Sequence, residues 1–400
     1  MPRPHVIVIG AGLGGLCLAQ GLRRNGVSVA VYESDDSLTA RRQGYRIHID
    51  GNGDRALARV LPGHLHELFR ATAGRPRPST PVYDHLLNRI AVIQPQDDGV
   101  HLAADRLTLR RILLAGIEDA VRFGKRFVGY KEEPDGRITA SFADGDEVTG
   151  DLLVAADGIN SAVRRQYLPH ARVVDTGLRQ LYGRVPLTAQ TRELFSDDMY
   201  AVFTPITGPG KRFVGVAPVE HPEPVGKAVA RLAPGLDLGP GEDYMTCSFG
   251  ARAELLPVDD EELRAMPGAE LRAMTLGMLD GWHPRVRAII EHWDVDSVFP
   301  IVLRTSVPIG RWPSRRDVTL LGDAVHAMSP AAGVGANTAL RDAAALADAV
   351  AGALADGGGE AMARAIDAYE ERMADYGFDA VRVSAMNGHR MLGQDPLPAG

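Results

Sequence analysis

HVIVIGAGLGGLCLAQGLRRNGVSVAVYE, residues 5–33, is the stretch that decides the fold. Residues 6–9 are all apolar, which is typical of a strand buried on both faces of a parallel sheet. A helical pattern follows and stops at Asn25-Gly26, and residues 27–32 predict a second strand. The stretch therefore predicts a βαβ unit, whose right-handed connection places the two strands parallel in one sheet.

The glycines after the first strand have the spacing Gly10-x-Gly12-x-x-Gly15, which is that of a dinucleotide-binding turn. Gly10 permits the tight turn, Gly12 lets a pyrophosphate approach the backbone, and Gly15 lets the helix pack on the strand. The first helical turn, which contains Leu13 and Gly14, would present its N–H groups and the positive end of the helix to the phosphates. All five residues are predicted to bind the cofactor.

Glu33 ends the second predicted strand. An acid about 20 residues beyond the glycines can bind the hydroxyls of a ribose. An acid rather than an arginine at this point favours an unphosphorylated ribose, and hence FAD or NAD rather than NADP as the bound dinucleotide.

Length and composition indicate an ordinary globular protein. The chain has 400 residues, of which 45% are hydrophobic and 24% charged, so we expect two domains or one elaborated α/β unit and exclude a disordered, collagen-like or disulfide-rich chain. The net charge of −7, with basic residues spread along the chain, argues against a nucleic-acid partner. Because forty of the 44 basic residues are arginines, a single arginine is weak evidence for a site.

The cysteines and the hydropathy pattern indicate a cytoplasmic protein without a membrane span. Cys17 and Cys247 are the only cysteines and lie far apart, which fits a reducing compartment and no zinc site. No run reaches the roughly 18 apolar residues of a membrane helix. His64-x-His66 has no third ligand nearby, so we predict no metal site.

The predicted secondary structure changes along the chain. Residues 102–120 have helical spacing, and a Gly-Asn-Gly turn is expected at 51–53. Residues 177–250 contain short strands with Gly/Pro turns, which predict a mostly antiparallel layer. A parallel-sheet strand returns at 317–321, and residues 337–391 predict a helical end with a turn at Asp356-Gly-Gly-Gly359. The acidic run 259–262 is predicted to be a solvated face.

The late strand leads into Gly322-Asp323 and then into a loop of small residues. The loop contains a Pro-x-x-Gly-x-Gly-x-Asn pattern, formed by Pro330, Gly333, Gly335 and Asn337. With the first βαβ unit, these segments resemble the flavoprotein aromatic hydroxylases, the family of para-hydroxybenzoate hydroxylase, salicylate hydroxylase and the tetracycline-inactivating monooxygenases. The resemblance covers the first 170 residues and the chain from about residue 300 onward.

The resemblance implies FAD as the cofactor, with the Asp323 carboxylate on its ribityl chain. Small loop residues would let the isoalloxazine ring lie against the backbone. The helix that begins near Asn337 would direct its positive end at the ring edge where reduced flavin carries charge. His326 matches a recurring loop histidine of the family, which we interpret as structural.

Three further elements of the family pattern imply cofactor contacts. Residues 157–164, DGINSAVR, are similar to the Asp-Gly-x-x-Ser-x-Val-Arg motif, which places Asp157 near the flavin pyrophosphate and the hydride-donor site. Arg106 begins an Arg-x-x-Leu-Arg helix in which the first arginine reaches the flavin, whereas Arg110 is interpreted as structural. Either Arg41 or Arg42 matches an arginine near the adenosine or the nicotinamide cofactor.

The function that the resemblance implies is a single-component FAD-dependent monooxygenase. It would use NADPH or NADH and O₂ to hydroxylate a small, electron-rich aromatic compound. A flavin epoxidase, a Baeyer–Villiger-type oxygenase, or a flavin-containing protein that sequesters a pathway intermediate without turnover are alternatives. No Ser-His-Asp arrangement or paired carboxylates stand out, and no catalytic residue is assigned.

The expected fold class is α/β. A Rossmann-like FAD-binding domain with a parallel sheet is expected over residues 1–75, 100–172 and 298–400, including the helical end. A smaller, mostly antiparallel β substrate domain is expected over 76–99 and 173–297. Within it, Tyr182 and Arg184 alternate on one strand face and either line a pocket or face solvent.

Overall fold

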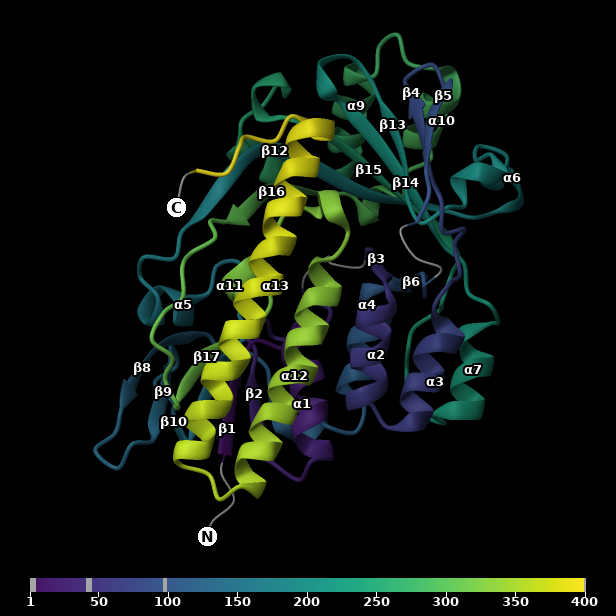
Figure 1. Ribbon diagram of the computed structural model, residues 1–400. Coiled ribbons are helices and arrows are strands. Elements are labelled where there is room, and N and C mark those ends of the chain that lie inside the picture. The colour runs from purple at the N-terminus through teal and green to yellow at the C-terminus, as the bar shows by residue number, and fades with distance from the viewer. Residues whose placement is uncertain (1–4, 41–44, 96–98, 399–400) are drawn as a thin grey trace.

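The computed structural model describes residues 5–40, 45–95 and 99–398, and Figure 1 shows its two layers. The lower layer is built on a parallel sheet of order β17-β11-β1-β2-β7. Its strands are β1 (His5–Ile9), β2 (Ser28–Tyr32), β7 (Val121–Arg122), β11 (Leu152–Ala155) and β17 (Val318–Leu320). β1 and β2 are joined by helix α1 (Leu13–Arg24), so the predicted βαβ unit is confirmed.

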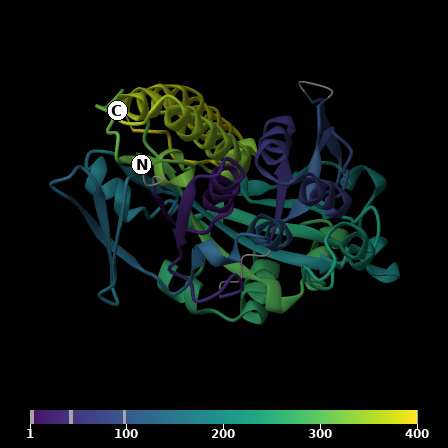
Figure 2. The ribbon, with the colours of Figure 1, turned by 90° about the horizontal axis from the view of Figure 1, so that it is seen from below.

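The helices of the lower layer include the C-terminal pair, which lies side by side in Figures 1 and 2. The pair consists of α12 (Gly335–Ala355) and α13 (Glu360–Leu392), joined by a turn through three glycines with positive φ. α12 packs on α1 and on α2 (Gly51–Val60). The predicted helical end is therefore confirmed. The other helices of the layer are α3 (Gly63–Thr72), α4 (Arg106–Leu114), α5 (Ala162–Tyr167), α7 (Val225–Leu232) and α11 (Asp323–His326).

The upper layer is a seven-stranded sheet of order β16-β12-β15-β14-β13-β4-β5, antiparallel except between β13 and β4. Its strands are β4 (Thr80–Asp84), β5 (Arg89–Ile93), β12 (Val173–Pro186), β13 (Thr204–Thr207), β14 (Phe213–Val219), β15 (Tyr244–Arg252) and β16 (Phe299–Ser306). This sheet confirms the predicted mostly antiparallel layer. β16 lies in the range predicted for the other domain, yet it hydrogen-bonds to β12 of this sheet.

The two faces of the large sheet differ in character. Residues directly opposite each other on antiparallel strands share a face. One face carries buried apolar side chains such as Leu181, Cys247 and Val216, and packs against α9 (Gly268–Met278) and α10 (Pro284–Glu291). The alternate residues of the same strands point toward the lower layer. The stacking of Tyr182 on Tyr45, which precedes β3, shows this direction.

Two predicted segment boundaries were wrong. In both places an aspartate caps the start of a helix, and the hydrophobic pattern alone did not reveal the cap. Residues 102–105 are strand β6, paired with β3 (Arg46–Ile49), and the helix begins only at Arg106. Asp105 caps it by accepting a hydrogen bond from the Thr108 N–H. Residues 51–53 are the first turn of α2 rather than a Gly-Asn-Gly turn, because Asp50 caps that helix.

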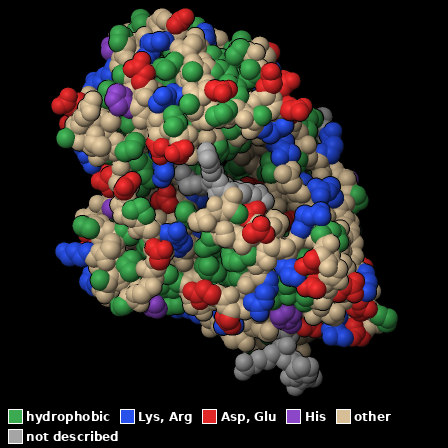
Figure 3. Space-filling view, turned by 180° about the vertical axis from the view of Figure 1, so that it is seen from behind, with side chains coloured by type: hydrophobic (Ala, Val, Ile, Leu, Met, Phe, Trp, Pro, Cys, Tyr) green, Lys and Arg blue, Asp and Glu red, His purple; other side chains and the backbone are tan. Residues whose placement is uncertain are grey.

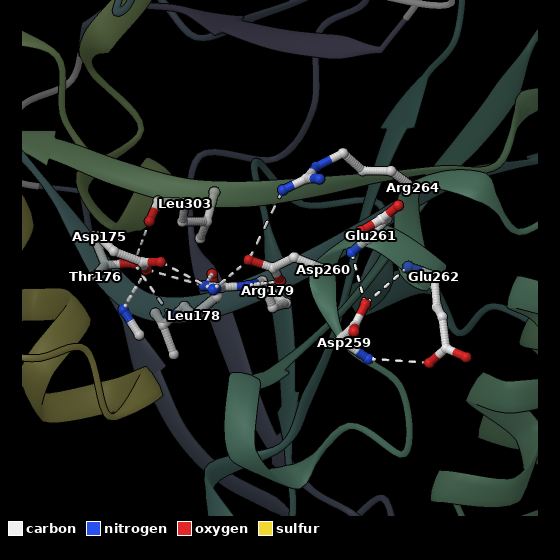
Figure 4. Close-up of polar contacts among 11 residues, drawn as sticks. Asp175, Thr176, Leu178, Arg179, Asp259, Asp260, Glu261, Glu262, Arg264 and Leu303 are labelled. Atoms are coloured by element: carbon white, nitrogen blue, oxygen red, sulfur yellow. Dashed lines mark hydrogen bonds and ion pairs between the residues drawn. The ribbon is translucent and has the colours of Figure 1, made fainter.

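The acidic run 259–262 is more than a solvated face, as Figure 4 shows. Asp259 caps α8 (Asp260–Ala265) in a capping box with Glu262. Asp260 forms an ion pair with Arg179 of β12, whose Nη2 lies 2.8 Å from its Oδ2, and Asp175 pairs with the same guanidinium at 2.9 Å. The prediction was wrong for Asp260 because its partner lies on a strand far away in the sequence.

A buried carboxylate anchors α13 to the parallel sheet. Glu370 accepts hydrogen bonds from Trp312 Nε1 at 2.8 Å, Ser314 Oγ at 2.6 Å and Thr319 Oγ1 of β17 at 2.7 Å. The Tyr167 hydroxyl of α5 donates at 3.4 Å. Burial raises the pKa of the Glu370 carboxyl, and the hydrogen bonds oppose the rise.

Replacing Glu370 by Gln is expected to lower the free energy of unfolding by about 2 kcal/mol, because an amide nitrogen cannot accept and leaves a buried donor unpaired. Urea denaturation followed by circular dichroism measures the change. The control is Glu371→Gln, which removes an exposed pair with Arg311 at 2.9 Å and should cost less than about 1 kcal/mol. Equal losses in the two variants would contradict an anchoring role for Glu370.

Candidate active site

The glycine turn between β1 and α1 has three crowded positions and one open one. A Cβ at Gly10, where φ is +105°, would lie 2.3 Å from the carbonyl oxygen of Ala156. A Cβ at Gly15 would lie 2.0 Å from the Gly10 oxygen, and one at Gly14 would lie 2.6 Å from Leu321. At Gly12, by contrast, a Cβ would meet nothing within 4 Å. Gly12 therefore leaves room beside the N-terminus of α1, as a bound pyrophosphate requires.

The Glu33 carboxylate is held against this turn. Its Oε2 accepts a hydrogen bond from the Ala11 N–H at 2.8 Å, and its Oε1 accepts one from the Asp35 N–H at 2.9 Å. Arg110 reaches the same turn from α4, since its Nη2 donates to the Ala11 oxygen at 3.0 Å. Glu33 thus lies at the end of β2 beside the glycines, and Arg110 braces the turn.

Asp157 follows the end of β11, the strand next to β1. Its Oδ2 accepts a hydrogen bond from the Ala162 N–H at 2.8 Å, at the start of α5. Its Oδ1 is buried without a hydrogen-bond partner, and burial raises the pKa of this carboxyl. An unpaired buried acceptor calls for a donor, which residues 5–40, 45–95 and 99–398 do not supply.

Asp323 follows β17, the strand on the other side of β11. Its side chain is accessible to solvent, although many protein atoms surround the carboxyl group. This crowding raises the pKa of the carboxyl, and the positive charges of His326 and Arg106 oppose the rise. Gly322, with φ +59°, makes the turn from the strand into α11. Arg106 of α4 and Asp323 are therefore close enough to interact electrostatically.

A buried hydrogen-bond network supports the Gly322-Asp323 turn from below. Asp342 of α12 accepts from the Gly322 N–H at 2.8 Å and from His326 Nε2 at 2.6 Å. Its other oxygen accepts from the Tyr376 hydroxyl of α13 at 2.6 Å. Burial alone would lower the pKa of His326, but the Asp342 carboxylate reverses this and raises it. His326 is thus a structural residue that ties the turn to the C-terminal helices.

The loop before α12 has the predicted small residues, but the side chain of Asn337 in the same pattern bonds within the protein. Pro330 starts a short 3₁₀ turn, Gly333 adopts a left-handed conformation with φ +67°, and Gly335 is the first residue of α12. The Asn337 side chain is buried, accepts from the Asp50 N–H at 3.0 Å and donates to the His48 oxygen at 2.9 Å. Its amide therefore joins α12 to β3 and α2.

These segments meet because four neighbouring parallel strands end at the same edge. Asp323 follows β17, Asp157 follows β11, the glycine turn follows β1, and Glu33 follows β2. In open α/β sheets this carboxyl edge is where ligands bind. Arg164 links two of the segments, since its Nη1 donates to the Ala324 oxygen at 2.8 Å. Arg41 and Arg42 lie outside the described residues.

An aromatic stack that the sequence did not reveal lies beside this edge. The rings of Tyr45 and Tyr182 stack with centroids 5.3 Å apart, and Phe299 stacks on Tyr182 at 5.8 Å. The Arg106 guanidinium lies 5.4 Å from the Tyr45 ring centroid. Tyr182 therefore faces the lower layer rather than solvent. Figure 3 shows a hollow between the two layers on the face opposite to that of Figure 1.

Two remaining predictions concern metals and membranes. His66 bonds to Asp54 at 3.0 Å, which explains it without a metal. Among residues 5–40, 45–95 and 99–398, no helix combines the length and the apolar character needed to cross a membrane.

Family comparisons match two segments of the chain. Residues 8–69 match the NAD(P)-binding Rossmann-like domain, and residues 311–384 match the FAD binding domain. The first range contains the glycine turn and Glu33, and the second contains Asp323, all of α12 and α13 as far as residue 384.

Similar proteins extend these matches to nearly the whole chain. The FAD-dependent urate hydroxylase of Klebsiella pneumoniae is 30% identical over 343 residues, which are 84% of this chain and 79% of that protein. The dual O-methyltransferase/FAD-dependent monooxygenase CTB3 of Cercospora beticola is 30% identical over 98% of this chain. The match is 47% of CTB3, so the chain spans about half the length of that relative.

Solved structures share the complete architecture. A protein of Photorhabdus luminescens described as an FAD-containing monooxygenase superposes with a TM-score of 0.83 at 30% identity, covering 98% of this chain and 99% of its own. Klebsiella pneumoniae HpxO, complexed with FAD and uric acid, superposes with a TM-score of 0.77 at 25% identity over 98% and 90% of the two chains.

The glycine turn yields a paired prediction. Gly10→Ala is expected to destabilise the ligand-free protein by about 1–3 kcal/mol or more, because of the strained φ and the clash with Ala156. Gly12→Ala should change the free energy of unfolding by less than about 0.5 kcal/mol, yet weaken FAD binding at least tenfold by filling the open space. Thermal unfolding of the apoprotein and fluorescence titration with FAD measure the two effects. The interpretation is wrong if Gly12→Ala binds FAD like the unaltered protein.

Proposed function

Because the chain belongs to the FAD-dependent monooxygenases, we propose that it is a single-component enzyme that hydroxylates a small, electron-rich aromatic compound with NADPH or NADH and O₂. The observation that carries the proposal is the convergence of the glycine turn, Glu33, Asp157 and Asp323 at one edge of four adjacent parallel strands. The aromatic stack beside that edge supports an aromatic substrate, because flat rings pack well against other rings.

The residues present fit FAD, since Gly12 leaves open space at the N-terminus of α1 and Asp157 offers an unpaired acceptor. In our assignment Glu33 holds the ribose, Asp323 the ribityl chain, and Arg106 the flavin. The remaining positions assigned to FAD are Gly10, Gly12, Leu13, Gly14, Gly15, Asp157, Gly322, Pro330, Gly333, Gly335 and Asn337. For Asn337 the assignment concerns the start of α12, because its side chain is already bonded within the protein.

Held at these positions, FAD would supply the redox chemistry that transfers two electrons from the nicotinamide to O₂. The overall reaction balances as follows: a ring C–H becomes C–OH, the second oxygen atom leaves as water, and NAD(P)H with one proton supplies the two electrons. The chain itself contributes binding, orientation and exclusion of water. The large sheet covers the substrate from above, and the loop from Pro330 to Gly335 lies beneath it.

We place the reductant transiently over the flavin. Within the described part of the chain, a strand, a Gly-x-Gly-x-x-Gly turn and a helix follow one another only at residues 5–24, so a second Rossmann unit for NAD(P)H has no counterpart there. Asp157 and either Arg41 or Arg42 are assigned to the docking position. Of the two proposed domains, the substrate domain (76–99 and 173–297) is best extended to include β16, which pairs with β12.

Replacing Asp323 by Ala should weaken FAD retention about tenfold or more, because it removes a charge-assisted hydrogen bond of about 1.5–3 kcal/mol. Equilibrium titration of the apoprotein with FAD measures the change. Asp348→Asn, which removes an exposed carboxylate of α12 that pairs with Arg59, is the control and should bind FAD normally. An Asp323→Ala protein that keeps FAD as tightly as the control would refute the assignment.

The reaction itself is tested with isotopically labelled dioxygen. An electron-rich aromatic should accelerate NAD(P)H consumption, and mass spectrometry should find one labelled oxygen atom in the ring-hydroxylated product. Label in an epoxide or in an ester beside a carbonyl would favour the epoxidase or the Baeyer–Villiger alternative. Label confined to hydrogen peroxide across a broad aromatic panel would reject hydroxylation and favour the sequestering protein.

A further inference from the structure

A polar cluster lies at one end of the sheet face that looks toward the lower layer. The cluster consists of Arg46 of β3, Asp105 of β6, Arg184 of β12, and Tyr244 and Thr246 of β15. The Tyr244 hydroxyl donates to Asp105 Oδ2 at 2.8 Å, and the Arg184 guanidinium lies 5.2 Å from the Tyr244 ring centroid. Four strands therefore bring two cations to one buried tyrosine.

Arg46 has an unused hydrogen-bond donor. Its Nε donates to the Pro218 oxygen at 3.2 Å, but its Nη2 is buried and has no acceptor. Asp105 lies directly opposite in the β3–β6 register, yet its two oxygens accept from Thr108 N–H and from Tyr244. In the part of the chain that the structure describes, no carboxylate forms an ion pair with Arg46.

The charge state of Arg46 makes this arrangement costly. Burial lowers the pKa of its guanidinium to about 10, which leaves it protonated at neutral pH. Its neighbour His48 adds no second positive charge, because burial lowers the pKa of that imidazole to about 3. Arg46 is only partly exposed, and the buried Nη2 end of its guanidinium has no counterion, an arrangement that a negatively charged ligand would stabilise.

Thr246 has a second unused polar group at the same place. Its side chain is buried, and Oγ1 has no hydrogen-bond partner. In the sheet register Thr246 lies between Arg184 of β12 and Ala217 of β14. Ala217 adjoins Pro218, the residue that binds Arg46, so the two unpaired donors lie at the same end of the sheet face.

Arg184 provides a contrast within the cluster. It is half-exposed and has its own counterion, since its Nη2 lies 3.6 Å from Asp294 Oδ2. It also contacts the face of the Tyr244 ring. Its charge is therefore compensated by the protein, whereas that of Arg46 is not.

We propose that Arg46 and Thr246 bind an anionic oxygen of the substrate, either an ionised hydroxyl or a carboxylate, and so determine which aromatics the enzyme accepts. The proposal rests on the proposed function for the aromatic nature of the substrate. Tyr182 and the Arg184–Thr246 pair are two residues apart on β12, or about 7 Å. The ring thus lies against the stack of Tyr45, Tyr182 and Phe299 while its anionic oxygen reaches Arg46.

The electrostatics of the site has a chemical consequence. A guanidinium favours the ionised form of a neighbouring acid. An ionised hydroxyl releases electron density into its ring, which makes the ring a better target for an electrophilic oxygen. A carboxylate would be held equally well but would not activate the ring. The two sources of the anion are therefore distinguished by experiment.

The test measures binding to the oxidised FAD holoenzyme without a reductant, followed by the flavin absorbance. The hydroxyl probes are 4-nitrophenol and 4-nitro-1-naphthol, each compared with its methyl ether. The carboxylate probes are 4-nitrobenzoate and 1-naphthoate, each compared with its amide. At least one acid should bind ten times more tightly than its neutral counterpart. If that acid is a hydroxyl probe, the anion is an ionised hydroxyl, and if it is a carboxylate probe, the anion is a carboxylate.

Substitutions show which residues cause the preference for the acid over its neutral counterpart. Arg46→Met should reduce the affinity for the acid at least tenfold and leave that for the neutral counterpart within twofold. Arg46→Lys should restore part of the loss, and Thr246→Val should weaken the acid about threefold or more. Arg184→Met is the matched control, since it removes a compensated charge nearby and should keep most of the preference.

Stability separates binding from a structural role. The melting temperature of ligand-free Arg46→Met should be unchanged or higher, because an uncompensated, partly buried charge is removed. A clearly lower melting temperature, equal affinities for acid and neutral probes, binding of none of the probes, or equal losses in Arg46→Met and Arg184→Met would each overturn the proposal. Acid-selective binding without hydroxylation would uphold this site and reject the proposed function, and hydroxylation without acid selectivity would do the reverse.

Discussion

The close approach of Gly10 to the carbonyl oxygen of Ala156 is the constraint on which the candidate site depends. With 2.3 Å between that oxygen and a would-be Cβ, only glycine lets the end of β1 pass beside the end of β11. The same turn is held on its other side by Glu33, whose carboxylate accepts from the Ala11 N–H. Because three strand ends are locked together in this way, Gly12 remains open at the start of α1.

The C-terminal helices complete the site from a distance. Two buried carboxylates attach them to the sheet, Glu370 through β17 and α5, and Asp342 through the Gly322-Asp323 turn. Each carboxylate accepts several hydrogen bonds, which offsets the cost of its burial. The FAD binding domain match at residues 311–384 covers both attachments. The helical end therefore supports the turn that positions Asp323.

The two faces of the large sheet serve different purposes: one forms the core of the upper layer, and the other carries the proposed substrate contacts. The apolar face packs on α9 and α10 and carries the core of the upper layer. The other face carries Tyr182, Tyr244 and the unpaired Oγ1 of Thr246, and Arg46 of β3, which donates to Pro218 of this sheet, has an unpaired Nη2. A face that serves only packing would have no reason to leave such groups unpaired.

The sequence by itself determined the βαβ unit, the C-terminal helices and the order of the strand-end motifs, because glycine spacing and hydrophobic periodicity act over a few residues. It placed Gly12, Glu33, Asp157 and Asp323 after four strands that prove to be neighbours. It did not reveal the strand at 102–105 or the ion pair of Asp260 with Arg179, whose partners lie elsewhere in the chain. Only the tertiary structure decided the Tyr45–Tyr182–Phe299 stack and left the Nη2 of Arg46 without an acceptor in the described part of the chain. They arise where two layers meet, and the packing of distant segments has no local signature.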